Sequence, residues 1–256
     1  MMYLYTMILI FVYMNLFFLL AITKKDNSIV DIGWGLGFIL VAIFQLIASD
    51  ILNIRQIMVS ILIILWGLRL SIYIYSRNRG KKEDFRYAKW RADWGKYWLI
   101  RSYLQVFILQ GIFMFTVVYP VIMLSSQQTS SLNLLDCLGV VIWVTGFFWE
   151  SMADYQKNKF KQVPSNKGKV MDSGVWKYSR HPNYFGESMM WWGIFVIVAS
   201  APHGIYAIFS PLIITFLLTK VSGIPLIEKH HQNDAAYQDY IRRTSVFFPW
   251  KPKAVK

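Results

Sequence analysis

The sequence predicts an all-α fold, a polytopic membrane bundle of about seven transmembrane helices with cytoplasmic loops forming the mouth of a cofactor site. Composition is the first reason: 55% of the 256 residues are hydrophobic and only 16% are charged, whereas about 25% are charged in an average soluble domain. The mean hydropathy of +0.38 is the second. The third is the recurrence of apolar stretches of about 20 residues, the length that crosses a bilayer. We therefore expect lipid to surround most of this chain.

Seven apolar stretches are candidates for these helices. They are residues 3–22, 29–49, 54–75, 100–124, 132–149, 184–200 and 205–221. The first is expected to be a mature helix, because it lacks the basic start and the small-residue cleavage site of a signal peptide. A short interfacial helix is expected within residues 227–250. Neither a repeat nor a linker divides the sequence, so we expect one domain over residues 1–256.

The basic residues predict the orientation of the helices. If seven helices alternate across the bilayer, 25 of the 27 Lys and Arg residues fall on one side; Arg55 falls on the other, and Arg69 lies within a helix. Lys and Arg concentrate in cytoplasmic loops. We therefore expect an integral membrane protein with its N-terminus outside, and with the loops 77–101 and 157–180 and the C-terminus in the cytoplasm.

Net charge and cysteine content limit the expected partners. A net charge of +13 would favour nucleic acid in a soluble protein. Here it follows the topology, so we expect membrane lipids with anionic headgroups as partners and no nucleic acid. The single cysteine, Cys137, lies in an apolar run, which argues against disulfides and thiolate clusters. Four histidines are too few for a histidine-rich di-iron centre, so no metal is expected.

Charged residues in or at the edge of apolar helices are candidates for function, because their burial in lipid is costly. They are Asp31, Arg69, Glu150, Asp154 and Glu187. Asp31 also has a structural alternative, since it lies near the start of its apolar stretch, where it can cap the helix or reach the headgroups. Arg69 can form a structural ion pair with Asp31. The sequence leaves these alternatives open.

Four charged residues share one helix face where the fifth apolar stretch leaves the membrane. Glu150, Asp154, Lys157 and Lys161 are spaced at i, i+4, i+7 and i+11, which is the helical period. Carboxylates there can accept hydrogen bonds from ribose or adenine, and lysines can hold phosphates. A solvated face supported by ion pairs within the helix would have the same spacing.

The densest polar motif is the run GVWKYSRHPNYFGE, which ends at Glu187. Pro182 favours a helix start, so Arg180 and His181 lie just before the sixth apolar helix. The unpaired N–H groups at a helix N-terminus attract anions, and Arg and His strengthen that attraction. Asn183 and Glu187 follow on one face. The motif predicts an anion site with polar groups one turn deeper; contact with lipid headgroups is the alternative.

These segments resemble a known membrane family. Residues 178–187, the run ESMAD at 150–154, and the C-terminal segment from SGIPLIEK at residue 222 to FPW at residue 250 resemble the family known as domain of unknown function 1295. That family is similar to the C-terminal domain of steroid 5α-reductases, over nearly the whole chain. RHPNY alone is shared with isoprenylcysteine methyltransferases and sterol reductases, whereas NYFGE is more specific.

The resemblance implies NADPH as the cofactor. It implies adenosine and phosphate contacts from Asp154 and Lys161, and nicotinamide-side contacts from Asn183 and Glu187. Together with the two motifs, the expected cofactor-binding residues are Glu150, Asp154, Lys157, Lys161, Arg180, His181, Asn183, Tyr184 and Glu187.

The resemblance also implies a catalytic acid and tyrosine. The 5α-reductases hold the substrate carbonyl with an acid on an early membrane helix and a tyrosine on a later one. Asp31 is the acid in this sequence, and Tyr73 or Tyr75 is the available tyrosine. We take Asp31 and Tyr73 as the implied catalytic pair, with a register that is ambiguous by a residue.

Three functions follow, from two different classes. The first is an NADPH-dependent reductase of a C=C bond in a lipid-soluble substrate. The second is a methyltransferase that uses S-adenosylmethionine, which has no phosphates and so leaves the lysines of 157–169 unexplained. The third is a nonenzymatic lipid-binding protein. The spaced glycines Gly33, Gly35 and Gly37 lie inside an apolar stretch, so they predict close helix packing rather than a dinucleotide fold.

The topology can be tested directly. Reporters fused at residue 128 and at residue 256 should give opposite compartment signals, because the basic loops place these positions on opposite sides. Equal signals would refute the seven-helix arrangement.

Overall fold

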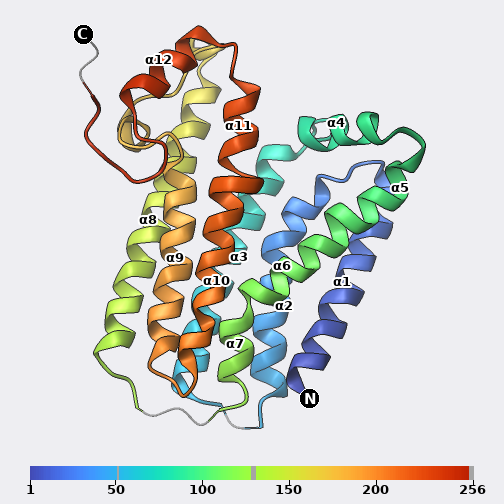
Figure 1. The fold of residues 1–256 in the computed structure, drawn as a ribbon, viewed down its shortest axis with the longest axis vertical. Helices are drawn as coiled ribbons and strands as arrows, with labels where there is room; N and C mark the ends of the chain where they lie inside the picture. Colours follow the sequence, from blue (N-terminus) through green and yellow to red (C-terminus); the bar gives the residue numbers. More distant parts are fainter. Residues whose placement is uncertain (51, 128–130, 254–256) are drawn as a thin grey trace. The chain divides into compact units, whose positions relative to one another are not determined.

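The regular structure is entirely helical over the residues that the computed structural model describes, which are 1–50, 52–127 and 131–253 (Figure 1). The all-α prediction is therefore confirmed. The chain divides into two compact units, which are described separately. The first unit comprises residues 1–132 and 201–210, and the second comprises residues 133–200 and 211–256.

The first unit is built from long antiparallel helices joined by short turns. Asn53 caps the third of them through its side chain. Pro120 lies in the first turn of the last helix, where its missing N–H costs no hydrogen bond. The helices are α1 (Met2–Lys24), α2 (Ile29–Ala48), α3 (Ile54–Asn78), α4 (Phe85–Trp94), α5 (Trp98–Arg101), a π-helical segment (Ser102–Ile108), α6 (Leu109–Val117) and α7 (Tyr119–Leu124).

The second unit contains one long helix and several shorter ones. Asn133 and Asp136 form a capping box at the start of the long helix, and Asp234 caps the last helix. The elements are α8 (Leu134–Gln162), 3-10 turns at Pro164–Asn166 and Gly174–Lys177, α9 (Pro182–Ala199), α10 (Phe209–Phe216, which begins in the first unit), a π-helical segment (Leu217–Val221), α11 (Ile224–His230) and α12 (Ala235–Arg243). The single interfacial helix expected within residues 227–250 is thus two short helices.

The long apolar helices identify an integral membrane protein. Six candidate spans occur among the described residues: Met2–Lys24, Ile29–Ala48, Ile54–Asn78, Phe85–Val117, Leu134–Gln162 and Gly204–His230. The seventh expected segment, residues 184–200, forms the 18-residue helix α9. It is not among the six, because Asn183, Glu187 and paired tryptophans lower the apolarity of its first turns.

Glycines let α2 and α3 pack backbone to backbone. A Cβ added to Gly35 would lie 2.6 Å from the carbonyl oxygen of Gly67, and one added to Gly67 would lie 2.7 Å from that of Gly35. Real Cβ atoms do not approach so closely. The predicted role of the spaced glycines in helix packing is confirmed.

Helices α8 and α9 pack in the same way. The ideal Cβ positions of Gly146 and Gly193 lie 2.6 Å from the carbonyl oxygens of Gly186 and Gly139, respectively, on the facing helix. The Cβ position of Gly186 lies 2.5 Å from the backbone nitrogen of Glu150. This close approach turns the face of α8 that carries Glu150 towards α9.

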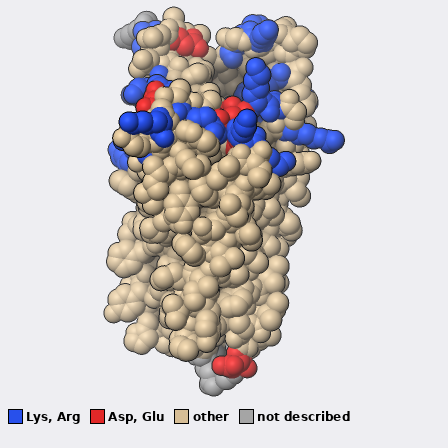
Figure 2. Space-filling model, turned by 90° about the vertical axis from the view of Figure 1, so that its right-hand side faces the viewer, with Lys and Arg blue, Asp and Glu red and all other residues tan. Residues whose placement is uncertain are grey.

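Basic residues gather at one end of the first unit. In the first unit, Lys24 ends α1 and Arg77 lies in the last turn of α3; these two ends lie together because α2 runs between them in the opposite direction. Figure 2 shows Lys and Arg gathered at one end of the face drawn there, while most of that face is uncharged. This pattern fits the predicted orientation in the membrane, which stays a prediction.

The helix packing yields a stability prediction. Replacing Gly146 with Ala should force α8 and α9 apart and destabilise the protein by about 1–3 kcal/mol. Thermal unfolding in detergent, followed by circular dichroism, measures the change. Val144→Ala is the matched control, because Val144 is exposed on the same helix. An equal melting temperature for Gly146→Ala and wild type would contradict the close packing.

Candidate cofactor site

The charged stripe of α8 runs along the side of that helix that meets α9 and the turn before it. Glu150 and Asp154 are buried. The ammonium of Lys157 lies 4.4 Å from the centre of the Trp176 ring, and the Trp176 indole N–H donates to the carbonyl of Ala153 at 3.0 Å. Lys161, one turn further on, is exposed. The stripe therefore leads from a buried acidic part to an exposed basic part.

The turn before α9 is fastened to α8 by Gln156. The backbone N–H of Val175 donates to Oε1 of Gln156 at 3.0 Å. Gly174 has a φ of 62°, a left-handed conformation that favours glycine. A Cβ at Gly174 would also collide with the Gln156 side chain. The turn therefore requires glycine at this position.

Arg180 directs its guanidinium at protein acceptors. Its Nε and Nη2 donate to Oε1 of Glu228 at 2.9 and 2.7 Å. Its Nη1 donates to the carbonyls of Thr244 at 2.6 Å and Ile241 at 3.2 Å. The side chain is only 8% exposed. Arg180 thus links the start of α9 to α11 and to the end of α12.

His181 lies beside the same carboxylate. Its Nε2 is 3.4 Å from Oε1 of Glu228, and its ring stacks on Tyr184 at 5.6 Å between centroids. Burial lowers the pKa of His181 below its ordinary value; Glu228 opposes this shift, whereas Lys157 and Arg180 add to it. The surroundings of His181 therefore favour its neutral form.

A C-terminal strap, residues 240–250, holds this turn from the other side. The Tyr240 hydroxyl donates to the carbonyls of Trp176 and Ser179. Three further hydrogen bonds join the strap to the turn: Arg180 N–H to the Ser245 carbonyl at 2.8 Å, the Ser179 hydroxyl to the Phe247 carbonyl at 2.8 Å, and Trp250 N–H to the Tyr178 carbonyl at 2.9 Å. The strap fixes the backbone that carries Arg180 and His181.

His231 and Tyr237 belong to this region, although the sequence did not single them out for a site. Their rings stack at 4.7 Å. Burial lowers the pKa of His231, and so do the charges of His230 and Lys157. Burial and the charge of Glu228 raise the pKa of Tyr237 to about 12. The positive charge of Lys157 lowers the pKa of both His181 and His231. Basic groups on α8, before α9 and after α11 therefore face a common region.

The polar residues of α9 lie just inside this region. Asn183 and Tyr184 are half-buried, and Glu187 is buried one turn further along the helix. The i, i+4 spacing of Asn183 and Glu187 places them on one face of α9. The second unit thus holds all nine expected cofactor-binding residues, on α8, on α9 and on the turn that precedes α9.

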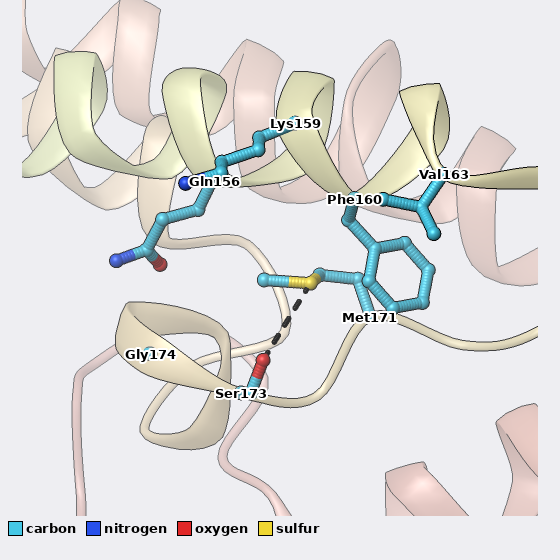
Figure 3. A pocket seen from close by; sticks show the side chains of 7 residues that line it. All are labelled: Gln156, Lys159, Phe160, Val163, Met171, Ser173 and Gly174. Atoms are coloured by element: carbon cyan, nitrogen blue, oxygen red, sulfur yellow. Dashed lines mark hydrogen bonds between the residues drawn. The ribbon is translucent and has the colours of Figure 1, made fainter. Parts of the chain in front are cut away.

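A shallow pocket of about 300 Å³ lies next to this region, between the last turns of α8 and residues 171–174 (Figure 3). Phe160 projects from α8 towards the segment that carries Met171, and the Ser173 hydroxyl contacts the Met171 sulfur at 3.8 Å. Its lining residues are Gln156, Lys159, Phe160, Val163, Met171, Ser173 and Gly174. Apart from Gln156 and Gly174, these residues are separate from the contacts described above.

The expected catalytic residues lie in the first unit. Both carboxylate oxygens of Asp31 have partners on α4: Oδ2 accepts from Arg86 at 2.7 Å, and Oδ1 accepts from the Tyr87 hydroxyl at 2.6 Å. The Tyr73 ring lies 5.7 Å from the guanidinium of Arg69 and 5.8 Å from that of Arg77. The tyrosine that the structure places on Asp31 is therefore Tyr87, and the cation there is Arg86.

Two of three comparisons with known proteins found a match. A family model described as "Protein of unknown function (DUF1295)" matches residues 17–244. A Schizosaccharomyces pombe protein named only as uncharacterized is 24% identical over 227 residues. That alignment covers 78% of this chain and 65% of the relative, so the chain spans 65% of the length of the relative it matches. The search of solved structures found no match. Since the family model covers most of the chain, this polytopic membrane protein belongs to the DUF1295 family.

Proposed function

We propose that this protein is a membrane-embedded, NADPH-dependent reductase of a C=C bond in a lipid-soluble substrate of the steroid-like, enone or isoprenoid class. One observation carries the proposal. In the second unit, Lys157 lies near the end of α8 and His231 follows the end of α11, and the charge of Lys157 acts on His231. Asn183 and Glu187 lie on α9, with the buried Glu187 one turn further along the helix than Asn183. A dinucleotide carries anionic phosphates, which suit the basic groups, and a polar carboxamide, which suits the amide and carboxylate of α9.

The residues of the second unit fit NADPH group by group. Lys157 and Lys161 would hold phosphates, which prefer ammonium and guanidinium partners. Glu150 and Asp154 would accept from the hydroxyls and amino group of the adenosine part. Asn183 and Glu187 would bind the carboxamide, with Tyr184 beside them. Arg180 is a poorer phosphate ligand than the sequence suggested, since four hydrogen bonds commit it to protein acceptors.

The chemistry divides between cofactor and protein. Bound NADPH supplies the hydride, and the protein supplies binding, orientation and exclusion of water. We assign polarisation of the substrate carbonyl to Asp31 and a tyrosine. The hydrogen bond between Asp31 and Tyr87 supports an acid–tyrosine pair; the role of Tyr73 stays a prediction.

A methyltransferase is the second candidate. The RHPNY run supports it equally, because that run occurs in both classes of enzyme. S-adenosylmethionine, however, has neither phosphates for Lys157 and Lys161 nor a carboxamide for Asn183 and Glu187. A lipid-binding protein would use the same basic groups for headgroups and would leave the buried Glu187 without a role.

Cofactor binding separates these candidates. Purified protein in detergent should bind NADPH or NADH and not S-adenosylmethionine in a fluorescence or calorimetric titration. Binding of S-adenosylmethionine alone would transfer the assignment to the methyltransferase, and binding of none of the three would leave the lipid-binding function.

Glu187 provides the sharper test of the reductase. Glu187→Gln should lower turnover of an enone lipid with NADPH roughly tenfold or more, since a charge-assisted hydrogen bond contributes about 1.5–3 kcal/mol. Affinity for an adenosine bisphosphate fragment should stay unchanged, because that fragment lacks the carboxamide. Asp93→Asn, an exposed change on α4, is the control. Loss of S-adenosylmethionine binding in Glu187→Gln would contradict the reductase.

A further inference from the structure

Glu228 is the carboxylate on which the donors around the start of α9 converge. One of its oxygens, Oε1, accepts from Nε and Nη2 of Arg180 and lies 3.4 Å from Nε2 of His181. Glu228 is 26% exposed, whereas Arg180 is 8% and His181 is 2% exposed. The carboxylate therefore connects two buried basic side chains with the surface of α11.

The protonation of His181 follows from this contact. An ionised carboxylate can only accept hydrogen bonds, so Nε2 of His181 must carry the proton that points at Glu228. Burial lowers the pKa of His181 and so favours the neutral ring. A neutral imidazole carries one proton, so Nδ1 is the nitrogen that can accept a hydrogen bond. The charged groups around the ring are Glu228 of α11, the adjacent Arg180 and Lys157 of α8.

The charge of Arg180 is balanced in the same place. Its guanidinium makes four hydrogen bonds to protein acceptors, two of them to Glu228. Four of the five N–H donors of Arg180 are therefore engaged by protein acceptors, and one N–H of Nη2 is left outside these contacts. The guanidinium is therefore a structural cation that fastens α11 and the C-terminal strap to the turn before α9.

We propose that Glu228 is a positioning residue of the cofactor site, which holds His181 as its Nε2–H tautomer with Nδ1 available as an acceptor, and which keeps Arg180 as a fastener rather than a phosphate ligand. The proposal rests on the proposed function for the identity of the ligand. His181 then offers its lone pair to a hydroxyl or amide donor of NADPH, while the phosphates are left to the lysines of α8.

The tautomer can be tested without any ligand. The protein has four histidines, so the ¹⁵N NMR spectrum of ¹⁵N-histidine-labelled protein contains the ring signals of four residues. The signals that disappear in the His181→Gln variant belong to His181. At pH 7.5 we expect a protonated Nε2 and an unprotonated Nδ1. Glu228→Gln should keep this tautomer, because the amide oxygen still accepts, whereas Glu228→Leu should give a mixture. An Nδ1–H tautomer in the wild-type protein would overturn the proposal even if NADPH binds.

A charge-neutral pair of changes tests the role of Arg180. Arg180→Met leaves Glu228 without its cation and should weaken NADPH binding tenfold or more. The double variant Arg180→Met, Glu228→Gln restores the charge balance and keeps an acceptor for His181, so its affinity should return to within about threefold of wild type. Lys157→Met is the matched control. It should weaken NADPH binding whether residue 228 is Glu or Gln.

Failure of the proposal for Glu228 and failure of the proposed reductase function give different results. If the double variant folds, as its melting temperature reports, but binds NADPH as poorly as Arg180→Met, then Arg180 contacts the phosphates and the proposal is wrong. If no variant and no wild-type protein binds NADPH while the Nε2–H tautomer is observed, the proposed function fails and the positioning of His181 by Glu228 stands.

Discussion

The second unit depends on one carboxylate oxygen, Oε1 of Glu228, which accepts from the guanidinium of Arg180 and lies beside the imidazole of His181. Breaking a buried ion pair by removing one partner typically costs about 3–5 kcal/mol, because the other charge is left uncompensated. Arg180 also holds the carbonyls of Ile241 and Thr244, so the strap, α11 and the start of α9 share this pair. The same contacts orient the residues that we assign to the cofactor.

The membrane explains why these polar contacts are concentrated at one end of the unit. Within the apolar part of α8 and α9, close packing is achieved by glycines, which bring backbones together without burying polar side chains. Beyond that part, where α8 continues past Glu150, polar side chains can be hydrogen-bonded at lower cost. Glu150, Asp154 and Glu187 lie at the transition between the two regimes, which is where a dinucleotide could reach from water towards a lipid-soluble substrate.

In the first unit, charged side chains near the ends of the membrane helices are paired with one another. Asp31 is held by Arg86 and Tyr87, and Glu83 accepts from Arg91 and from the backbone of Asn27. These contacts fasten α4 to the connection between α1 and α2. The charge of Asp31, near the start of α2, is thereby paired with that of Arg86. The Tyr87 hydroxyl lies 2.6 Å from the same carboxylate, as an acid–tyrosine site would need.

The sequence by itself determined the helices and the residues that share a face, because apolar length, capping residues and the 3.6-residue period act locally. It predicted the stripe from Glu150 to Lys161 and the helix start at Pro182. Tertiary structure decided the partners: Glu228 is 48 residues from Arg180, and Tyr87 is 56 residues from Asp31. Periodicity cannot choose among distant acids and tyrosines, since that choice depends on which faces pack together. The tertiary structure therefore placed the guanidinium of Arg180 among protein acceptors and the hydroxyl of Tyr87 beside Asp31, while the role of Tyr73 stays a prediction.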